Sequence, residues 1–160
     1  MSYEVLLDYL PNIVICQEVK HLMYAAGLGL LIGCERAFKH KAASIRTFAL
    51  LSAGSALFTL LSTMATSNSP DSMVDNSRIA AQIVSGLGFL GAGVIFRYQD
   101  KLSGITTAVM IWFTAAVGMA CGFGKISLAV SAVAIYYAIL IVGELLHRLA
   151  GTKKDQDDDD

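Results

Sequence analysis

Charged residues are absent from five long stretches of this 160-residue chain, and that absence excludes an ordinary soluble core. Only 16% of the residues are charged and 55% are hydrophobic, so the charges cluster between the apolar stretches. These stretches are residues 21–34, 47–70, 79–96, 102–124 and 126–143. About 20 apolar residues in a helix cross the hydrocarbon layer of roughly 30 Å. The last three stretches fit directly, the second fits after its polar end is trimmed, and the first is too short.

The chain also lacks the alternating pattern of an outer-membrane barrel. A backbone inside lipid must satisfy its own hydrogen bonds, which only helices and closed barrels do. With the barrel excluded, the spans should be helices. We therefore predict an all-α membrane protein, a bundle of five transmembrane helices. Nine Lys and Arg residues fall on one side of these spans and three on the other. The positive-inside rule then predicts an N-terminus outside and a C-terminus in the cytoplasm.

Motifs for catalysis and for metal or nucleotide binding are missing as well. The three cysteines form no CxxC pair, and the three histidines have no metal-ligand spacing. No Ser/His or paired-carboxylate motif indicates an intramembrane protease, and no nucleotide-binding motif indicates ATP-driven pumping. We expect no enzyme activity, no cofactor and no nucleic-acid partner.

Composition divides the chain into three parts. Residues 1–19 contain a short apolar segment that is interrupted by Pro11 and Asn12, and we expect an interfacial arm there. Glu4 and Asp8 stand where a signal sequence would carry basic residues, so the N-terminus should be retained. Residues 20–149 form the transmembrane domain. Residues 150–160 form an acidic tail that we expect to be disordered.

Small residues recur on one face of two predicted spans. In the first span they are Ala25, Gly29 and Gly33, and in the third they are Ala81, Ser85, Gly88 and Ala92. Close backbone contact is a main source of helix association in lipid, because apolar side chains gain little there by leaving the solvent. Two interpretations remain open: these faces pack the five helices together, or they form a surface for a partner.

Four glycines lie close together in the third span, at Gly86, Gly88, Gly91 and Gly93. In water each costs up to about 1 kcal/mol of helix propensity, so we expect the helix to kink or break there. Discontinuous membrane helices expose backbone dipoles that bind ions or substrates. The segment is therefore a candidate transport element.

Charges at the helix ends predict an ion pair. Glu35 closes the first span and Arg46 opens the second, and the helix macrodipole disfavours the sign of each. The first span also reaches full length only if Glu35 and Arg36 enter the membrane boundary. An ionisable group there requires a partner, so we expect Glu35 to contact Arg46 with Arg36 nearby. A solvated Glu35 is the alternative.

A second polar group precedes and opens the third span. Asp75 can cap the helix, Arg78 opposes its dipole, and Gln82 points into the membrane from the same face. This group either holds the helix end or admits an ion or ligand. Asp75 is the candidate metal ligand, for Mg2+.

The same residues carry a family resemblance. The segments are 31–36 (LIGCER), 44–47 (SIRT), 78–95 (RIAAQIVSGLGFLGAGVI) and 104–108 (GITTA) with Trp112. In this order they resemble the motifs of the MgtC/SapB family of bacterial inner-membrane proteins. The functional polar positions that the resemblance carries over are Glu35, Arg36, Arg46, Thr47, Asp75, Arg78, Gln82, Thr106 and Thr107. It also carries over the third-span glycines and Gly104 as packing positions.

The resemblance implies a multi-pass inner-membrane protein associated with growth at low magnesium, and in pathogens with survival in macrophages. It implies a regulated membrane partner, such as an ATP synthase or a cation-transporting ATPase. The small-residue faces favour a homodimer. The chain departs from the virulence-factor members because it ends soon after the fifth span, and Ser44 replaces a usual glycine. Two hypotheses remain: a regulatory subunit in Mg2+ homeostasis, or a conduit for Mg2+ or another small solute.

Overall fold

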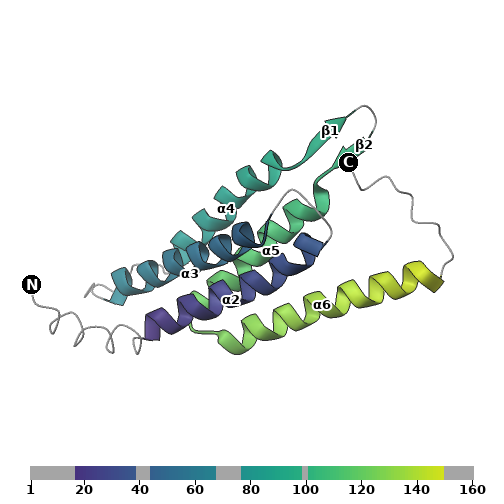
Figure 1. Ribbon diagram of the computed structural model, residues 1–160. Coiled ribbons are helices and arrows are strands. Elements are labelled where there is room, and N and C mark those ends of the chain that lie inside the picture. Colours follow the sequence, from purple (N-terminus) through teal and green to yellow (C-terminus); the bar gives the residue numbers. More distant parts are fainter. Residues whose placement is uncertain (1–16, 39–43, 68–76, 99–100, 150–160) are drawn as a thin grey trace, which may run out of the picture.

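Five helices and one short hairpin make up the described part of the computed structural model, which covers residues 17–38, 44–67, 77–98 and 101–149 (Figure 1). The acidic tail and Asp75 lie outside the described residues, and so does the predicted arm except for residues 17–19. The helices are α2 (Gln17–Phe38), α3 (Ile45–Ser67), α4 (Ser77–Gly93), α5 (Ile105–Gly122) and α6 (Ile126–Leu149).

Helices α2, α3 and α5 form the core, and glycines bring their backbones together. A Cβ added at Gly29 of α2 would lie 2.6 Å from the carbonyl oxygen of Phe48 in α3. One added at Gly122 of α5 would lie 2.6 Å from the carbonyl oxygen of Ala56, also in α3. Helix α3 is therefore in backbone contact on two sides. On the small-residue face of the first span, Ala25 is fully buried, and a Cβ added at Gly33 would lie 2.8 Å from the Cα of Ile45.

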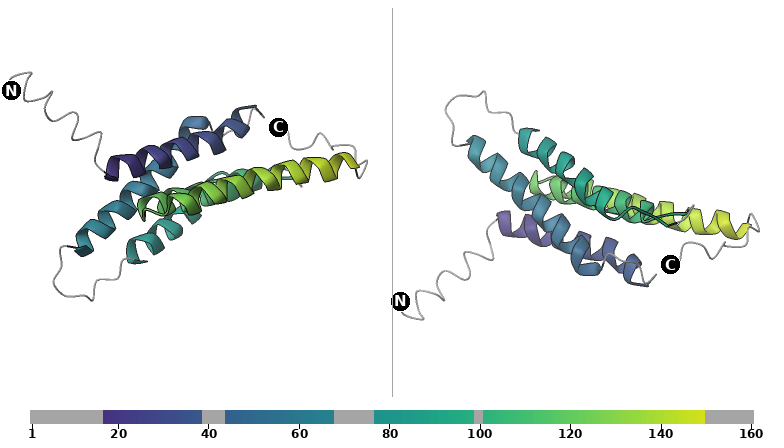
Figure 2. Two further views of the ribbon diagram at one scale, coloured as in Figure 1. Left: turned by 90° about the horizontal axis from the view of Figure 1, so that it is seen from below. Right: turned by 90° about the horizontal axis from the view of Figure 1, so that it is seen from above.

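Helices α4 and α6 lie at the edges of this core (Figures 1 and 2). Helix α4 buries only Leu87 among its described side chains, and α6 buries only Ala129 and Val133. From Ile141 to Leu149 every residue of α6 is exposed. Long apolar side chains on these two helices thus face outward, as expected where lipid rather than water surrounds the bundle.

A two-stranded hairpin, not predicted from the sequence, joins α4 to α5. Strand β1 (Phe96–Tyr98) pairs antiparallel with β2 (Lys101–Ser103), and Phe96 lies opposite Ser103. Gly104 follows with φ of 87°, and a Cβ there would overlap the carbonyl oxygen of Val94. The chain therefore turns into α5 through a position that only glycine fits without strain.

The expected kink in the third span is wrong: α4 runs unbroken from Ser77 to Gly93 through all four glycines. The propensity cost of glycine is measured in water, where the unfolded backbone can bond to solvent. In an apolar environment a broken helix leaves backbone groups unsatisfied, at several kcal/mol each, so the helix persists. Of the four glycines, only Gly93 lies at the end of the helix.

Three of the helices are long and apolar enough to cross a membrane by length and composition: α3, α5 and α6. Helix α2 has 22 residues but carries charges near both ends, and α4 has 17 residues, which gives about 25 Å of helix. The described chain is therefore consistent with an all-α membrane protein.

Candidate functional site

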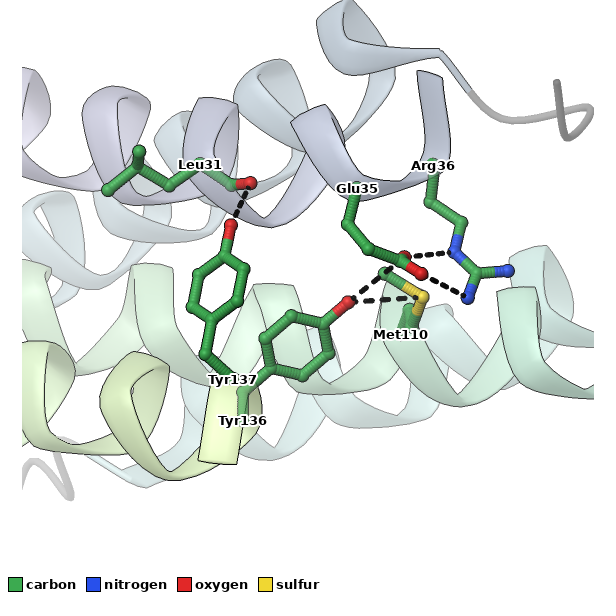
Figure 3. A network of polar contacts seen from close by, with 6 residues as sticks. All are labelled: Leu31, Glu35, Arg36, Met110, Tyr136 and Tyr137. Atoms are coloured by element: carbon green, nitrogen blue, oxygen red, sulfur yellow. Dashed lines mark hydrogen bonds and ion pairs between the residues drawn. The ribbon is translucent and has the colours of Figure 1, made fainter. Parts of the chain in front are cut away.

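A buried ion pair lies near the C-terminal end of α2. The Nε of Arg36 donates to Oε2 of Glu35 at 2.7 Å, and one Nη donates to Oε1 at 3.4 Å (Figure 3). The side chains are only 6% and 12% exposed, respectively. Removing two charges from water is costly, so such a pair needs good geometry and further hydrogen bonds.

Two tyrosines of α6 reach across to α2. The hydroxyl of Tyr136 donates to Oε2 of Glu35 at 3.4 Å and also lies 3.6 Å from Sδ of Met110 in α5. The hydroxyl of Tyr137 donates to the backbone carbonyl of Leu31 (Figure 3). Three helices thus meet at this polar cluster, which we define as Glu35, Arg36, Met110, Tyr136 and Tyr137.

The expected contact between Glu35 and Arg46 stays a prediction. Arg46 is exposed in the first turn of α3, and the guanidinium beside Glu35 belongs to Arg36. Neighbours in a helix point about 100° apart and do not ordinarily face each other. Here the arginine side chain is long enough for its guanidinium to reach the carboxylate of the preceding residue. Thr47 is also exposed, and its hydroxyl lies 3.2 Å from that of Ser44.

The predicted polar group of the third span lies far from this cluster, in the first two turns of α4. Arg78 and Gln82 are both exposed there, at the opposite end of the bundle (Figure 1). Asp75 falls outside the described residues, so its role as helix cap or metal ligand stays a prediction. Among the residues that the structure describes, no three His, Cys, Asp or Glu gather into a group that could hold a metal ion.

The third-span glycines do not pack the single chain together. A Cβ added at Gly86, Gly88 or Gly93 would meet nothing within 4 Å, and one at Gly91 would make only ordinary contact with Ala108 at 3.8 Å. Ser85 is exposed as well. This face of α4 is therefore open, in contrast to the small-residue face of α2.

Sequence reasoning missed the buried hydroxyl groups of α3 and α5. The buried serines and threonines are Ser52, Ser55, Thr59, Ser62, Thr107 and Thr114. On α3 they recur at intervals of three or four residues, which is a helical period that the sequence could have revealed. The hydroxyls of Ser52 and Thr114 are fully buried and have no hydrogen-bond partner among the residues that the structure describes. Of the two predicted threonines of α5, Thr106 is exposed and Thr107 is buried.

Comparison with known proteins agrees with the motifs. The family described as MgtC family matches residues 22–149. Protein MgtC of Salmonella typhimurium (strain LT2) is 44% identical over 132 residues, which is 82% of this chain and 54% of the relative. Protein MgtC of Brucella abortus (strain 2308) is 45% identical over 112 residues, 70% of this chain and 45% of the relative.

The chain thus spans about half the length of the curated relatives that it matches. No solved structure matches it. The family match covers four of the five described helices in full and all but the first residues of α2. The chain belongs to the MgtC family.

Proposed function

We propose that this protein is a multi-pass protein of the bacterial inner membrane that supports adaptation to low magnesium by regulating another membrane protein. Membership of the MgtC family supports the link to Mg2+, the regulated ion. In this proposal all five helices cross the membrane, and the Arg36 end of the bundle faces the cytoplasm. The count of Lys and Arg residues supports that orientation.

The observation that carries the regulatory proposal is the open small-residue face of α4. Ser85 and Gly88 are exposed there, and in the described part of the chain nothing lies within 4 Å of a Cβ added at Gly88. In lipid, such a face lets the backbone of another helix come close, which favours association. A second copy of the chain fits the same requirement, and we expect a homodimer. An ATP synthase or a cation-transporting ATPase is the kind of larger partner that the family resemblance favours.

The hydrogen bonds and the burial of the Glu35 carboxylate support a regulatory role over ion conduction. Mg2+ is bound through carboxylates and retained waters, and it dehydrates reluctantly. The carboxylate of Glu35 already accepts hydrogen bonds from Arg36 and Tyr136, and only 12% of its side chain is exposed. A carboxylate neutralised by an adjacent guanidinium is a poor ligand for a hydrated divalent cation.

The buried hydroxyls of α3 and α5 favour the second candidate, a conduit for Mg2+ or another small solute. Hydroxyl oxygens could line a path through the middle of the bundle. However, Ser52 is held between two glycines: its Cβ lies 2.8 Å from where a Cβ of Gly29 would stand, and its backbone touches Gly118. Such close packing supports a solid core more than a path.

Cation flux separates the two candidates. Liposomes that contain only the purified protein should show no more Mg2+ uptake than protein-free liposomes, as measured with an internal Mg2+ indicator. The physical reason is that the core is close-packed at Ser52. Uptake that is saturable and proportional to the amount of protein would support the conduit instead, and a mock-reconstituted sample serves as the control for leakage.

Association should depend on Gly88. We expect Gly88→Leu to keep the fold, because nothing lies within 4 Å of the added Cβ, but to lower the dimeric fraction in detergent by about tenfold. Light scattering of the purified variant measures this fraction. Gly143→Leu on α6, also with nothing within 4 Å, is the matched control and should leave the mass unchanged. An unchanged dimeric fraction for Gly88→Leu would remove α4 from the interface.

A further inference from the structure

The two helices that flank the hairpin are short for membrane spans. Helix α4 has 17 residues and α5 has 18, which gives about 25 Å and about 27 Å of helix, whereas the hydrocarbon layer is roughly 30 Å thick. Arg78 is the second residue of α4, so this end of the helix cannot move further into the layer without burying a charge. The missing length of the α4 span is therefore supplied at the hairpin end.

The residues at the base of the hairpin are apolar and exposed. Ile95 is 39% exposed, Phe96 is 53% exposed and Leu102 is 60% exposed. They belong to, or directly precede, two strands of only three residues each, and a two-stranded hairpin is at best marginally stable on its own in water. Their apolar side chains fit the outer edge of the hydrocarbon layer better than they fit water.

Basic residues come next along both strands, one position further from the helices. They are Arg97 in β1, which is exposed, and Lys101 in β2, with Asp100 as the one acidic residue between them. The hairpin lies at the end of the bundle where α2 and α6 also end (Figure 1). This is the end that carries most of the Lys and Arg residues. The hairpin thus changes from apolar to basic in the direction that leads out of the hydrocarbon layer.

We propose that the hairpin lies in the headgroup layer of the cytoplasmic leaflet and binds an anionic phospholipid. Phe96 and Leu102 contact the first carbons of the acyl chains, and the guanidinium of Arg97 donates to the phosphate. Arginine suits this role because its planar guanidinium binds two phosphate oxygens at once. Lys101 adds positive charge, and the negative surface potential of the leaflet attracts basic segments that lie next to membrane spans.

This proposal rests on one part of the function proposed above, the crossing of the membrane by α4 and α5. It needs no regulated partner. It also gives a reason for the pairing of β1 with β2. Backbone groups at the edge of the hydrocarbon layer find little water, and the pairing satisfies some of them within the hairpin.

The depth of the hairpin can be measured with brominated lipids, which quench tryptophan fluorescence, on the full chain in lipid nanodiscs. The chain has one tryptophan, Trp112, which lies near the middle of α5 and is 54% exposed. In the wild-type protein, bromine near the end of the acyl chains should quench Trp112 more than bromine near the headgroup. In the double variant Trp112→Phe/Phe96→Trp this order should be reversed. Trp112→Phe/Leu102→Trp should give the same reversal and serves as the second probe.

Failure of this proposal and failure of the proposed function give different results. Absence of quenching of Trp112 by deep bromine would show that α5 does not cross the membrane, and both would fall together. Normal quenching of Trp112, with no quenching of a tryptophan at position 96 or 102 by either lipid, would overturn the lipid proposal alone. Protection of those two probes from iodide would then assign the hairpin to a protein surface.

The preference for anionic lipid is measured with the tryptophan at position 96. It is the ratio of quenching by brominated phosphatidylglycerol to quenching by brominated phosphatidylcholine at equal mole fraction. We expect Arg97→Gln to lower the relative affinity for phosphatidylglycerol about fivefold, as the loss of one basic residue near a charged surface implies.

Arg148→Gln is the matched control for Arg97→Gln. Arg148 is an exposed arginine at the same end of the bundle, but it bonds to Glu144 one turn earlier in α6. Its loss should leave the ratio at position 96 unchanged. Equal quenching by the two lipids before Arg97 is changed, or an equal loss of preference in both glutamine variants, would overturn the binding of an anionic phospholipid by Arg97.

Discussion

Gly118→Ala should destabilise the protein by about 3 kcal/mol or more, although it adds a single methyl group. The Cβ would overlap the backbone carbonyl oxygen of Ser52, so helices α3 and α5 would have to separate along their contact. Overpacking of a close-packed core costs about 1–3 kcal/mol when side chains can yield, and here the obstacle is backbone. Unfolding in mixed micelles with increasing sodium dodecyl sulfate measures the change.

Gly54→Ala is the matched control for Gly118→Ala. Gly54 is also a helical glycine, in α3, but a Cβ there would meet nothing within 4 Å. Its free energy of unfolding should change by no more than about 1 kcal/mol, in the stabilising direction that alanine has over glycine in helices. Equal stability of the two alanine variants would contradict backbone contact between α3 and α5.

Arg36→Met should lower the free energy of unfolding by about 3–5 kcal/mol. The change removes the guanidinium that lies 2.7 Å from the Glu35 carboxylate, and breaking a buried ion pair at one partner leaves a charge poorly compensated. Adding Glu35→Gln should restore much of the loss, because the amide carries no charge and still accepts the hydrogen bond of Tyr136. A double variant no more stable than Arg36→Met would show that the arginine acts through packing.

Arg148→Met supplies the comparison for Arg36→Met. Arg148 donates to Glu144 at 3.2 Å one turn earlier in α6, but both side chains are largely exposed. Exposed ion pairs contribute little, so this variant should stay within about 1 kcal/mol of the wild-type protein. A loss as large as that of Arg36→Met would mean that burial does not distinguish the two pairs.

The helices could be predicted from the gaps between charges because the cost of charge in lipid dominates the sequence. The predicted span at residues 102–124 contains α5, at Ile105–Gly122. The residues at which the helices end were less predictable. Helix α6 continues to Leu149, past Glu144, because a charge at the end of a membrane helix can reach water without ending the helix.

Which small residues pack could not be read from spacing. The faces of α2 and α4 have the same period, yet a Cβ added at Gly29 would meet α3, and one added at Gly88 would meet no described residue within 4 Å. Among the helical glycines, Gly118 has the closest contact with another helix, at the carbonyl oxygen of Ser52, although the sequence pattern had indicated the third span instead. Period identifies a helix face, but only the arrangement of the five helices decides what lies against it.

The hydrogen-bond partners of Glu35 could not be predicted from the sequence either. Tyr136 is 101 positions away along the chain, on a helix whose rotation is fixed only by the fold. Arg36 is adjacent in sequence and was expected nearby, but helix geometry alone disfavours a contact between neighbours. The shortness of the first apolar stretch indicated only that Glu35 and Arg36 enter the membrane boundary, and it did not indicate which groups they bond to.

The loose attachment of α6 has a consequence for how this helix can vary. Its two buried residues and the two tyrosines all lie between Ala129 and Tyr137, so the rotational phase of the helix is set in its first half. Beyond Tyr137 the helix continues for 12 residues, about 18 Å, and none of them is buried. Insertions or deletions there would turn the distal end about its axis by roughly 100° per residue without disturbing the core. Whatever follows this helix can therefore be presented at different angles on one unchanged bundle.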